Sequence, residues 1–412
     1  MTNNPPEILA PVGDADKLRV ALEYGADAVY LGGADLSLRA KSGGFSFEEL
    51  PGALRLARER GARVYYCLNA LPREPDMARV REVLEHLAGL GPDGPDALII
   101  ADPGVFRLAR NIAPGLEVHL STQANTANAE AVAFWRGLGA TRVNLARELD
   151  LYSIRALTRR FPDMEFEIFA HGAMCMAVSG HCLLSEHLGG RSANMGLCTH
   201  PCRYEYRPTA LRLEEGTRPG QDTWELVQDE GFSRILASDD QCLVRFLPWF
   251  RKAGVAALKL EGRTKSEGYL AQVVDVYTTA RADLEQGRFR IGLYLEELAN
   301  ASTRRLATGF FLPGGRRFVA DPPDPAERRP ILAKVLERVQ DGCWRIAVKS
   351  RWRAGEDVRI LAPGLERPLL AGKEYGLEDN EGNLLQAANS GLTAVLRADH
   401  PALAPGRFLR NG

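Results

Sequence analysis

The chain has 412 residues, of which 45% are apolar and 25% are charged. This composition is typical of a globular protein, and the length predicts about two domains. The net charge of −1 does not by itself favour a nucleic acid or a membrane surface as partner. Because no run of about 18 apolar residues occurs, we expect no membrane span.

The beginning of the chain, MTNNPPEILAP, has neither the basic region nor the apolar run of a signal peptide. We therefore expect a cytoplasmic protein. Disulfides rarely persist in that reducing compartment, so the seven cysteines require another explanation.

Eight short apolar segments rich in β-branched residues recur through the first two thirds of the chain, with helix-like segments between them. They begin at Glu7, Asp27, Arg63, Ala97, Glu117, Arg142, Glu165 and Ala257. Several are almost wholly apolar, as strands buried on both faces must be. Eight such units predict an α/β fold, a closed (β/α)8 TIM-like barrel over residues 1–290. An open doubly wound sheet is the alternative, and the missing G-x-G-x-x-G after the first strand weakens its dinucleotide-binding version.

Helix signals separate the predicted strands. Asp14 can cap the first helix and Gly25 can end it. Ser46 and Glu49 have the spacing of a capping box, and Gly61 closes the helix that follows. The alternation of strand and helix signals supports the barrel.

The regular spacing is interrupted after the seventh strand, where residues 172–255 form an insertion. An insertion after a barrel strand lies at the C-terminal face, where barrel enzymes do their chemistry. The last part of the insertion, from Ser238 to Gly254, is predicted to be a capped helix that restarts at Pro248.

Residues 291–330, which are rich in proline and glycine, are predicted to be a linker. Residues 331–412 alternate in strand fashion around a turn at Asp341 and Gly342, which predicts a small antiparallel β-barrel domain. Residues 301–412 carry 18 Lys and Arg against 13 Asp and Glu, an excess of basic residues that is compatible with a module that contacts RNA. Ordinary solvated arginines are the alternative.

Most of the cysteines lie in the insertion. They are Cys175, Cys182, Cys198, Cys202 and Cys242. Clustered thiolates favour zinc or an iron–sulfur cluster, whereas isolated cysteines are more often small buried residues. A structural zinc site prefers paired C-x2-C motifs, and the short pair here is C-T-H-P-C. The spacing leaves both metals open, and five cysteines are available for the four ligands of a cubane.

Polar residues recur at the C-terminal ends of the predicted barrel strands, where side chains can face a substrate. The candidates for catalysis are His171, Arg147, Arg263 and Glu261. The candidates for substrate binding are Asn69, Asp102, Gln123 and Glu148. Each can instead cap a helix or pair with a neighbour.

Arg147 and Arg263 are the candidates for binding an anion, because a guanidinium group can hold a carboxylate or phosphate through two parallel hydrogen bonds. The alternative is that each pairs with its neighbouring carboxylate, Glu148 or Glu261. His171 precedes the cysteine-rich segment and can move a proton or orient the backbone.

The run EIFAHGAMCMAVSGHCLLS, from Glu167 to Ser185, closely resembles the signature of the collagenase-like peptidase family. Four other segments resemble further blocks of the same family and occur in the same order. They are APVGDADKLRVALEYGADAVYLGG, STQAN, ARELDL and LKLEGRTK. The resemblance extends over nearly the whole chain and is closest to a branch that hydroxylates tRNA.

The resemblance implies oxygen-independent hydroxylation that depends on a [4Fe–4S] cluster. In this branch the product is 5-hydroxyuridine at the wobble position of tRNA, with prephenate as a linked co-substrate, a small-molecule hydroxyl donor and an unidentified redox partner. Cys175, Cys182 and Cys198 match the first three cluster ligands. Cys242 follows S-D-D-Q, where the family has S-K-D-L, and is preferred to Cys202 as the fourth ligand.

Two other functions stay open. The family label suggests a peptidase, although the chain has neither H-E-x-x-H nor G-x-S-x-G. The cysteines are also compatible with a zinc-stabilised RNA-binding or assembly factor, in which the metal is structural.

Overall fold

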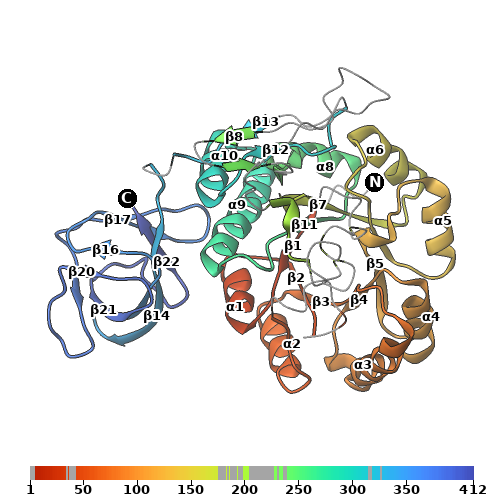
Figure 1. Cartoon of the computed structure of the whole chain (residues 1–412), viewed down its shortest axis with the longest axis horizontal. Coiled ribbons are helices and arrows are strands. Elements are labelled where there is room, and N and C mark those ends of the chain that lie inside the picture. The colour runs from red at the N-terminus through yellow and green to blue at the C-terminus, as the bar shows by residue number, and fades with distance from the viewer. Residues whose placement is uncertain are drawn as a thin grey trace.

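The computed structural model describes residues 5–33, 36, 43–174, 182, 185, 193, 198–203, 227–229, 232–234, 239–313, 318–324 and 327–412. Eight parallel strands form a closed barrel, which confirms the predicted fold class (Figure 1). The strands are β1 (Glu7–Pro11), β2 (Ala28–Leu31), β3 (Arg63–Leu68), β4 (Ala97–Ile100), β5 (Glu117–Leu120), β6 (Arg142–Asn144), β7 (Glu165–Ala173) and β11 (Ala257–Leu260). β11 pairs in parallel with both β1 and β7 and so closes the barrel.

Helices alternate with the strands and cover the outside of the barrel (Figure 1). They are α1 (Ala15–Glu23), α2 (Leu50–Glu59), α3 (Met77–Gly89), α4 (Pro103–Ile112), α5 (Ala129–Gly137), α6 (Leu151–Arg160), α8 (Leu247–Ala253) and α9 (Glu267–Glu285). Short 3-10 helices are η2 (Glu74–Asp76), η3 (Gly91–Asp93), η4 (Thr122–Ala124), η6 (Pro201–Arg203) and η7 (Val244–Phe246).

The predicted helix caps are present. The Asp14 side chain accepts a hydrogen bond from the backbone N–H of Lys17, and Gly25 has a left-handed φ of +86° just after α1. The capping box also forms, because the backbone N–H groups of Ser46 and Glu49 each donate to the other residue's side chain.

The seventh strand continues beyond its barrel neighbours and leaves an edge that part of the insertion uses. β10 (Asp240–Cys242) pairs antiparallel with the end of β7, and β12 (Leu306–Ala307) and β13 (Phe318–Ala320) widen the sheet further. The prediction of a helix at residues 240–242 is wrong, because the backbone there pairs with β7. The helix α8 begins only at Leu247.

The segment expected to include a linker contains ordered elements. Residues 291–330 include α10 (Ile291–Ala301) as well as β12 and β13. α10 packs against α9, and the buried Tyr294 hydroxyl donates to Asp283 at 2.6 Å. The apolar residues of α10 therefore anchor this segment to the outer layer of the barrel.

The remaining residues form a seven-stranded antiparallel sheet with its own apolar core. Its strands are β14 (Ile331–Gln340), β15 (Cys343–Val348), β17 (Val358–Leu361), β18 (Leu369–Leu370), β19 (Gly376–Glu378), β21 (Thr393–Arg397) and β22 (Phe408–Asn411). Two-stranded ladders join β16 (Trp352–Arg353) to β20 (Ala387–Ala388), and β8 (Val227–Asp229) to β9 (Phe232–Arg234). Within the described residues the edge strands β18 and β19 are not paired with each other, so the antiparallel sheet is a half-barrel.

The helix α9 lies between the barrel and the second sheet (Figure 1). Arg410 donates to Glu297 of α10 at 2.8 Å, and Arg367 donates to Asp275 of α9 at 2.8 Å. Because all four side chains are largely buried, these charge pairs fix the second sheet against α9 and α10.

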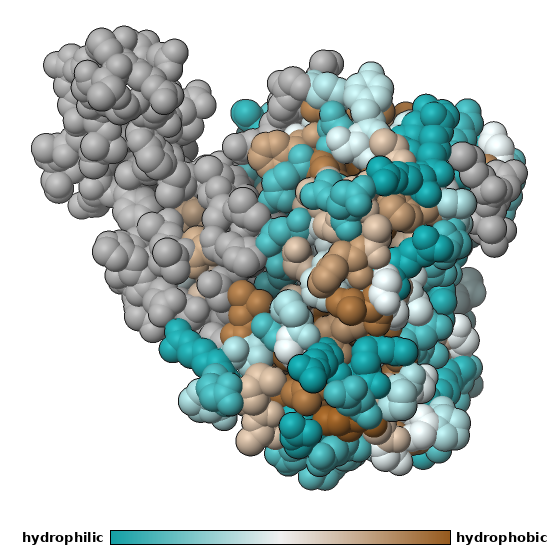
Figure 2. Space-filling model, turned by 90° about the vertical axis from the view of Figure 1, so that its right-hand side faces the viewer, coloured by the Kyte–Doolittle hydropathy of each residue, from teal (hydrophilic) through white to brown (hydrophobic). Residues whose placement is uncertain are grey.

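The outer helices present a mixed surface. Figure 2 shows one side of the molecule, on which hydrophobic residues are interspersed with hydrophilic ones. None of the helices that the structure describes combines the length and the apolar character needed to cross a bilayer.

Candidate active site

The interior of the barrel carries charged side chains where such barrels usually carry branched apolar ones. Near the start of the strands, Arg142 donates to Glu7 at 2.8 Å. Farther along, Glu167 accepts from Lys259 at 3.0 Å and from Asn144 at 2.7 Å. Buried charges require partners, and these cations and carboxylates satisfy one another. The polar interior therefore reaches toward the C-terminal mouth of the barrel.

Lys259 lies beside two aromatic rings at this mouth. Its ammonium nitrogen is 4.4 Å from the ring centre of Tyr30 and 5.5 Å from that of Phe169. The guanidinium carbon of Arg147 lies 3.7 Å from the centre of the same Phe169 ring. Both cations lie over the Phe169 ring, and the ring's quadrupole attracts a cation to its π face.

Arg147 lies three residues beyond the end of β6 and is half-buried. Its Nη1 group donates to the carbonyl oxygen of Ala173 at 2.9 Å. In the described part of the chain no carboxylate pairs with Arg147, and the neighbouring Glu148 is exposed. The guanidinium group thus retains N–H donors that no described carboxylate occupies, and anion binding by Arg147 stays a prediction.

Glu261 follows β11 and is held by two neighbours. The Tyr30 hydroxyl donates to the carbonyl oxygen of Leu260 at 2.8 Å and lies 3.3 Å from Oε2 of Glu261. Gly172 has a φ of +105°, and a Cβ atom there would lie 2.6 Å from the carbonyl oxygen of Glu261. Only glycine fits this contact, which brings the end of β7 against the base of Glu261.

Arg263 is almost completely buried in the wall of the mouth. Its Nη2 group donates to the carbonyl oxygen of Gly43 at 2.8 Å, and its own carbonyl oxygen accepts from Lys17 at 2.9 Å. These contacts tie β11 to the segments after β2 and β1. Arg263 is therefore less accessible to a ligand than Arg147.

His171 faces away from the mouth. Its ring centre lies 6.2 Å from that of Tyr269 and 5.6 Å from that of Tyr277, both on the outer helix α9. Burial lowers the pKa of His171 to about 4, so the ring is neutral at pH 7. The structure places this predicted catalytic residue between the barrel wall and α9, opposite Cys242 in the β7–β10 pair.

The three predicted substrate-binding residues after β3, β4 and β5 have different environments. Asp102 accepts from the backbone N–H of Val105 at 2.9 Å, so its carboxylate caps α4. Gln123 is buried in η4, and its Oε1 atom lies 3.4 Å from Oγ of Ser121. Asn69 is half-buried just beyond β3.

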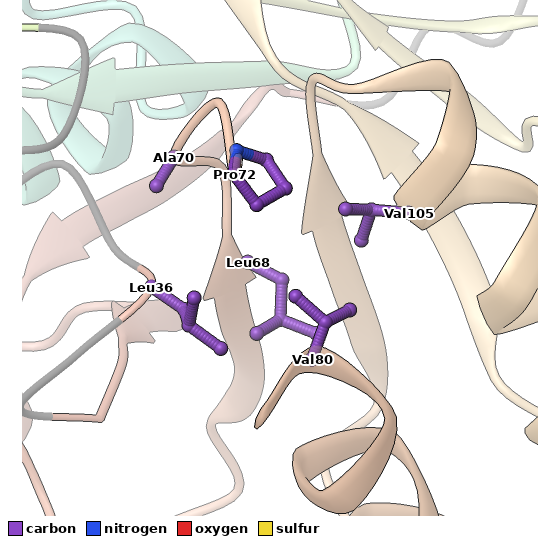
Figure 3. Close-up of a pocket in the computed structure, with 6 residues that line it drawn as sticks. All are labelled: Leu36, Leu68, Ala70, Pro72, Val80 and Val105. Atoms are coloured by element: carbon purple, nitrogen blue, oxygen red, sulfur yellow. The ribbon is translucent and has the colours of Figure 1, made fainter. Parts of the chain in front are cut away.

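A small apolar pocket lies near Asn69, between the end of β3 and the helices α3 and α4. Figure 3 shows its lining side chains, and its empty volume is about 160 Å³. The lining residues are Leu36, Leu68, Ala70, Pro72, Val80 and Val105. The described side chains that line this pocket are all apolar, so they offer no catalytic chemistry.

The predicted cluster cysteines are partly described. Cys182 and Cys198 are half-buried free thiols, and Cys198 accepts from the backbone N–H of His200 at 3.3 Å. Cys202 is also half-buried. Cys242 is also free but buried, and burial raises its pKa to about 11. Cys175 lies outside the described residues. Over the described ranges, no three His, Cys, Asp or Glu side chains are gathered as a ready metal site.

Sequence reasoning missed Lys259, Tyr30 and Phe169 as parts of the mouth. Their signal is the alternation of inward and outward positions along each strand. Lys259 stands between two leucines in the apolar strand ALKL, so a charged residue at that position must enter the barrel interior.

Comparisons with known proteins find relatives over most of this chain. The model of Peptidase family U32 matches residues 13–317. The tRNA hydroxylation protein P of Escherichia coli (strain K12) is 34% identical to this chain over 399 residues, covering 87% of this chain and 86% of the relative. The tRNA hydroxylation protein P1 of Bacillus subtilis (strain 168) is 32% identical over 415 residues, covering 99% and 95%.

A collagenase of Porphyromonas gingivalis (strain ATCC BAA-308 / W83) is 33% identical over 326 residues, covering 76% of this chain and 75% of the relative. Relatives named for different activities therefore match most of the same chain. Because the family model matches well over half of the residues, the chain belongs to peptidase family U32.

Proposed function

We propose that this protein is an enzyme of tRNA hydroxylation. The observation that carries the proposal is the similarity, over 99% of this chain, to a relative named for tRNA hydroxylation. The barrel mouth supports it, because the mouth combines an arginine free of carboxylate partners with a carboxylate held in a fixed position. A tRNA substrate is consistent with the cytoplasmic location that the sequence predicts.

The proposed product is 5-hydroxyuridine at the wobble position, formed without molecular oxygen and with prephenate as co-substrate. Prephenate carries two carboxylates, and the guanidinium group of Arg147 suits one of them. Glu261 can accept a hydrogen bond from the N3–H group of a uracil ring. Arg147 would thus bind prephenate and Glu261 would bind the uracil ring, with Phe169 and Lys259 between the two binding residues.

A [4Fe–4S] cluster is part of the proposal, with Cys175, Cys182, Cys198 and Cys242 as ligands and Cys202 as the alternative fourth ligand. The free thiols fit such a group, because iron–sulfur clusters bind thiolates. When bound, the cluster would supply one-electron redox chemistry. Since burial disfavours the Cys242 thiolate, a nearby positive iron would be needed to stabilise it.

A peptidase is the second candidate, favoured by the family name and by the collagenase relative. The two functions differ in what they require from the cysteines. Hydroxylation requires an intact cluster, whereas peptide hydrolysis by metal-free protein does not.

The test uses a strain that lacks this gene and every redundant hydroxylation pathway, complemented with the wild type or a variant. Mass spectrometry of digested tRNA should show 5-hydroxyuridine with the wild type and at most a tenth of it with Cys198→Ser. Anaerobically purified Cys198→Ser should also lose iron and sulfide. Cys343→Ala, a buried cysteine of the second sheet, is the matched control and should retain both.

Two results would overturn the proposal. One is unchanged 5-hydroxyuridine in the strain without the gene. The other is gelatin cleavage by metal-free, protease-free protein that survives replacement of Cys175 and Cys182, combined with normal tRNA modification in the same strain.

A further inference from the structure

We propose that Lys259 is a positioning residue, which holds Arg147 and Glu261 in their working places through the rings of Phe169 and Tyr30. The inference rests on the proposed function, because it assigns a role within the same mouth. It adds a residue that touches neither substrate but sets the geometry of two residues that do.

The first step concerns why a lysine is buried there. Lys259 is 4% exposed, and its ion-pair partner within the described structure is Glu167, which is 1% exposed. A buried ion pair is seldom more stable than a well-packed apolar pair of similar size. Glu167 also lies 3.6 Å from Arg142, so a second cation already compensates its charge. Stability alone therefore gives little reason for a lysine at this position.

The second step is the contact with Phe169. The Lys259 nitrogen is 5.5 Å from the ring centre, and the Arg147 guanidinium carbon is 3.7 Å from it. A ring drawn toward Lys259 offers Arg147 one preferred stacking position. The hydrogen bond from Arg147 to the Ala173 carbonyl then fixes the rotation of the guanidinium plane.

The third step is the contact with Tyr30. The Lys259 nitrogen is 4.4 Å from the Tyr30 ring centre, and the hydroxyl of that ring reaches the Leu260 carbonyl and the Glu261 carboxylate. Displacement of the Tyr30 ring would therefore move one hydrogen-bond donor to Glu261. Lys259 is the residue that both contacts share.

The experiment compares Lys259→Met/Glu167→Gln with the wild type. The double variant removes both charges of the pair, so it should fold with a melting temperature within a few degrees of the wild type and with normal iron content. Its apparent KM for prephenate should rise at least tenfold, a larger effect than on kcat. The conservative variant Lys259→Arg should restore part of the loss.

The matched control is Lys334→Met/Glu267→Gln, which removes a largely buried lysine–glutamate pair at the contact between α9 and β14. It should retain the wild-type KM. A wild-type KM in the folded Lys259→Met/Glu167→Gln variant would overturn the inference.

A second measurement does not depend on the reaction. Phenylglyoxal modifies accessible arginines, and peptide mass mapping gives the rate at Arg147, with the exposed Arg136 as internal reference. The rate at Arg147 should rise several-fold in Lys259→Met/Glu167→Gln. An unchanged rate would overturn the positioning role, whereas an inactive wild type with an increased Arg147 rate in the variant would overturn only the proposed function.

Discussion

The ammonium nitrogen of Lys259 and the carboxylate of Glu167 lie 3.0 Å apart inside the barrel, and both side chains are buried. Burial alone would raise the pKa of Glu167, but Lys259 and Arg142 outweigh it and hold that pKa below its ordinary value. The carboxylate is therefore charged at neutral pH. The Lys259–Glu167 pair connects the charged residues near the start of the strands with those at the C-terminal mouth.

Glu167→Gln should destabilise the protein by about 3–5 kcal/mol, because Lys259 would remain buried without its carboxylate. Urea unfolding followed by circular dichroism measures this change. The double variant Lys259→Met/Glu167→Gln should recover most of the lost free energy of unfolding. Equal stability of Glu167→Gln and the wild type would show that water already reaches Lys259.

Arg147→Lys should lower the yield of 5-hydroxyuridine at least tenfold while leaving the melting temperature nearly unchanged. Lysine keeps the charge but loses the planar fork and the stacking on Phe169. Nucleoside mass spectrometry of tRNA from the complemented strain gives the yield. Arg159→Lys, at the exposed end of α6, is the control, and full activity of Arg147→Lys would remove Arg147 from the substrate site.

Gly172→Ala should destabilise the protein by at least about 2 kcal/mol, since a left-handed φ and a collision with Glu261 act together. Gly61→Ala is the matched control. Gly61 also has a left-handed φ, of +71°, but no atom lies within 4 Å of its would-be Cβ. The Gly61→Ala variant should lose only about 1 kcal/mol of its free energy of unfolding. Equal losses in the two variants would contradict the close contact at Gly172.

The stability of the wild type should fall as the pH falls below about 6.5, the ordinary pKa of histidine, because of His119. Burial, assisted by Arg142, lowers the pKa of His119 inside the barrel. Below pH 6.5, His119 binds a proton in the unfolded chain but stays neutral in the native state, so acid favours unfolding. The slope from this residue is at most about 1.4 kcal/mol per pH unit.

The check is to compare the free energy of unfolding of the wild type and His119→Phe between pH 7.5 and pH 5. The difference between the two proteins should change below pH 6.5, in favour of the variant. Parallel curves would mean that His119 titrates alike in the folded and unfolded chains.

The barrel could be predicted because its signals are local. Each strand is an apolar segment, and caps such as Asp14 and turns such as Gly25 depend on residues a few positions apart. The position of Arg147 beyond the end of a strand could be predicted for the same reason, while its role in binding stays a prediction. The mouth as an assembly could not, because the meeting of Tyr30, Phe169 and Lys259 depends on the register of strands far apart in the sequence.

His171 and Cys242 show a second limit. Alternation along β7 would direct His171 to the same side as Phe169, but the register shifts at the pairing of β7 with β11, between Lys259 and Leu260. Such a bulge re-aims the side chains beyond it, and His171 instead contacts α9. The strand at Cys242 likewise forms because it pairs with the free edge of β7. The local sequence pattern around Cys242 does not indicate that this edge is available.

The helix α9 has neighbours on two fronts, with Asp275 and Gln272 reaching Arg367 and Arg410 of the half-barrel while Tyr277 reaches the barrel wall. The half-barrel and the (β/α)8 barrel therefore both pack against α9. A hinge rotation between them would expose the charged side chains of these contacts to water. A nucleic acid bound by the half-barrel would therefore be held at a fixed distance and angle from the (β/α)8 barrel.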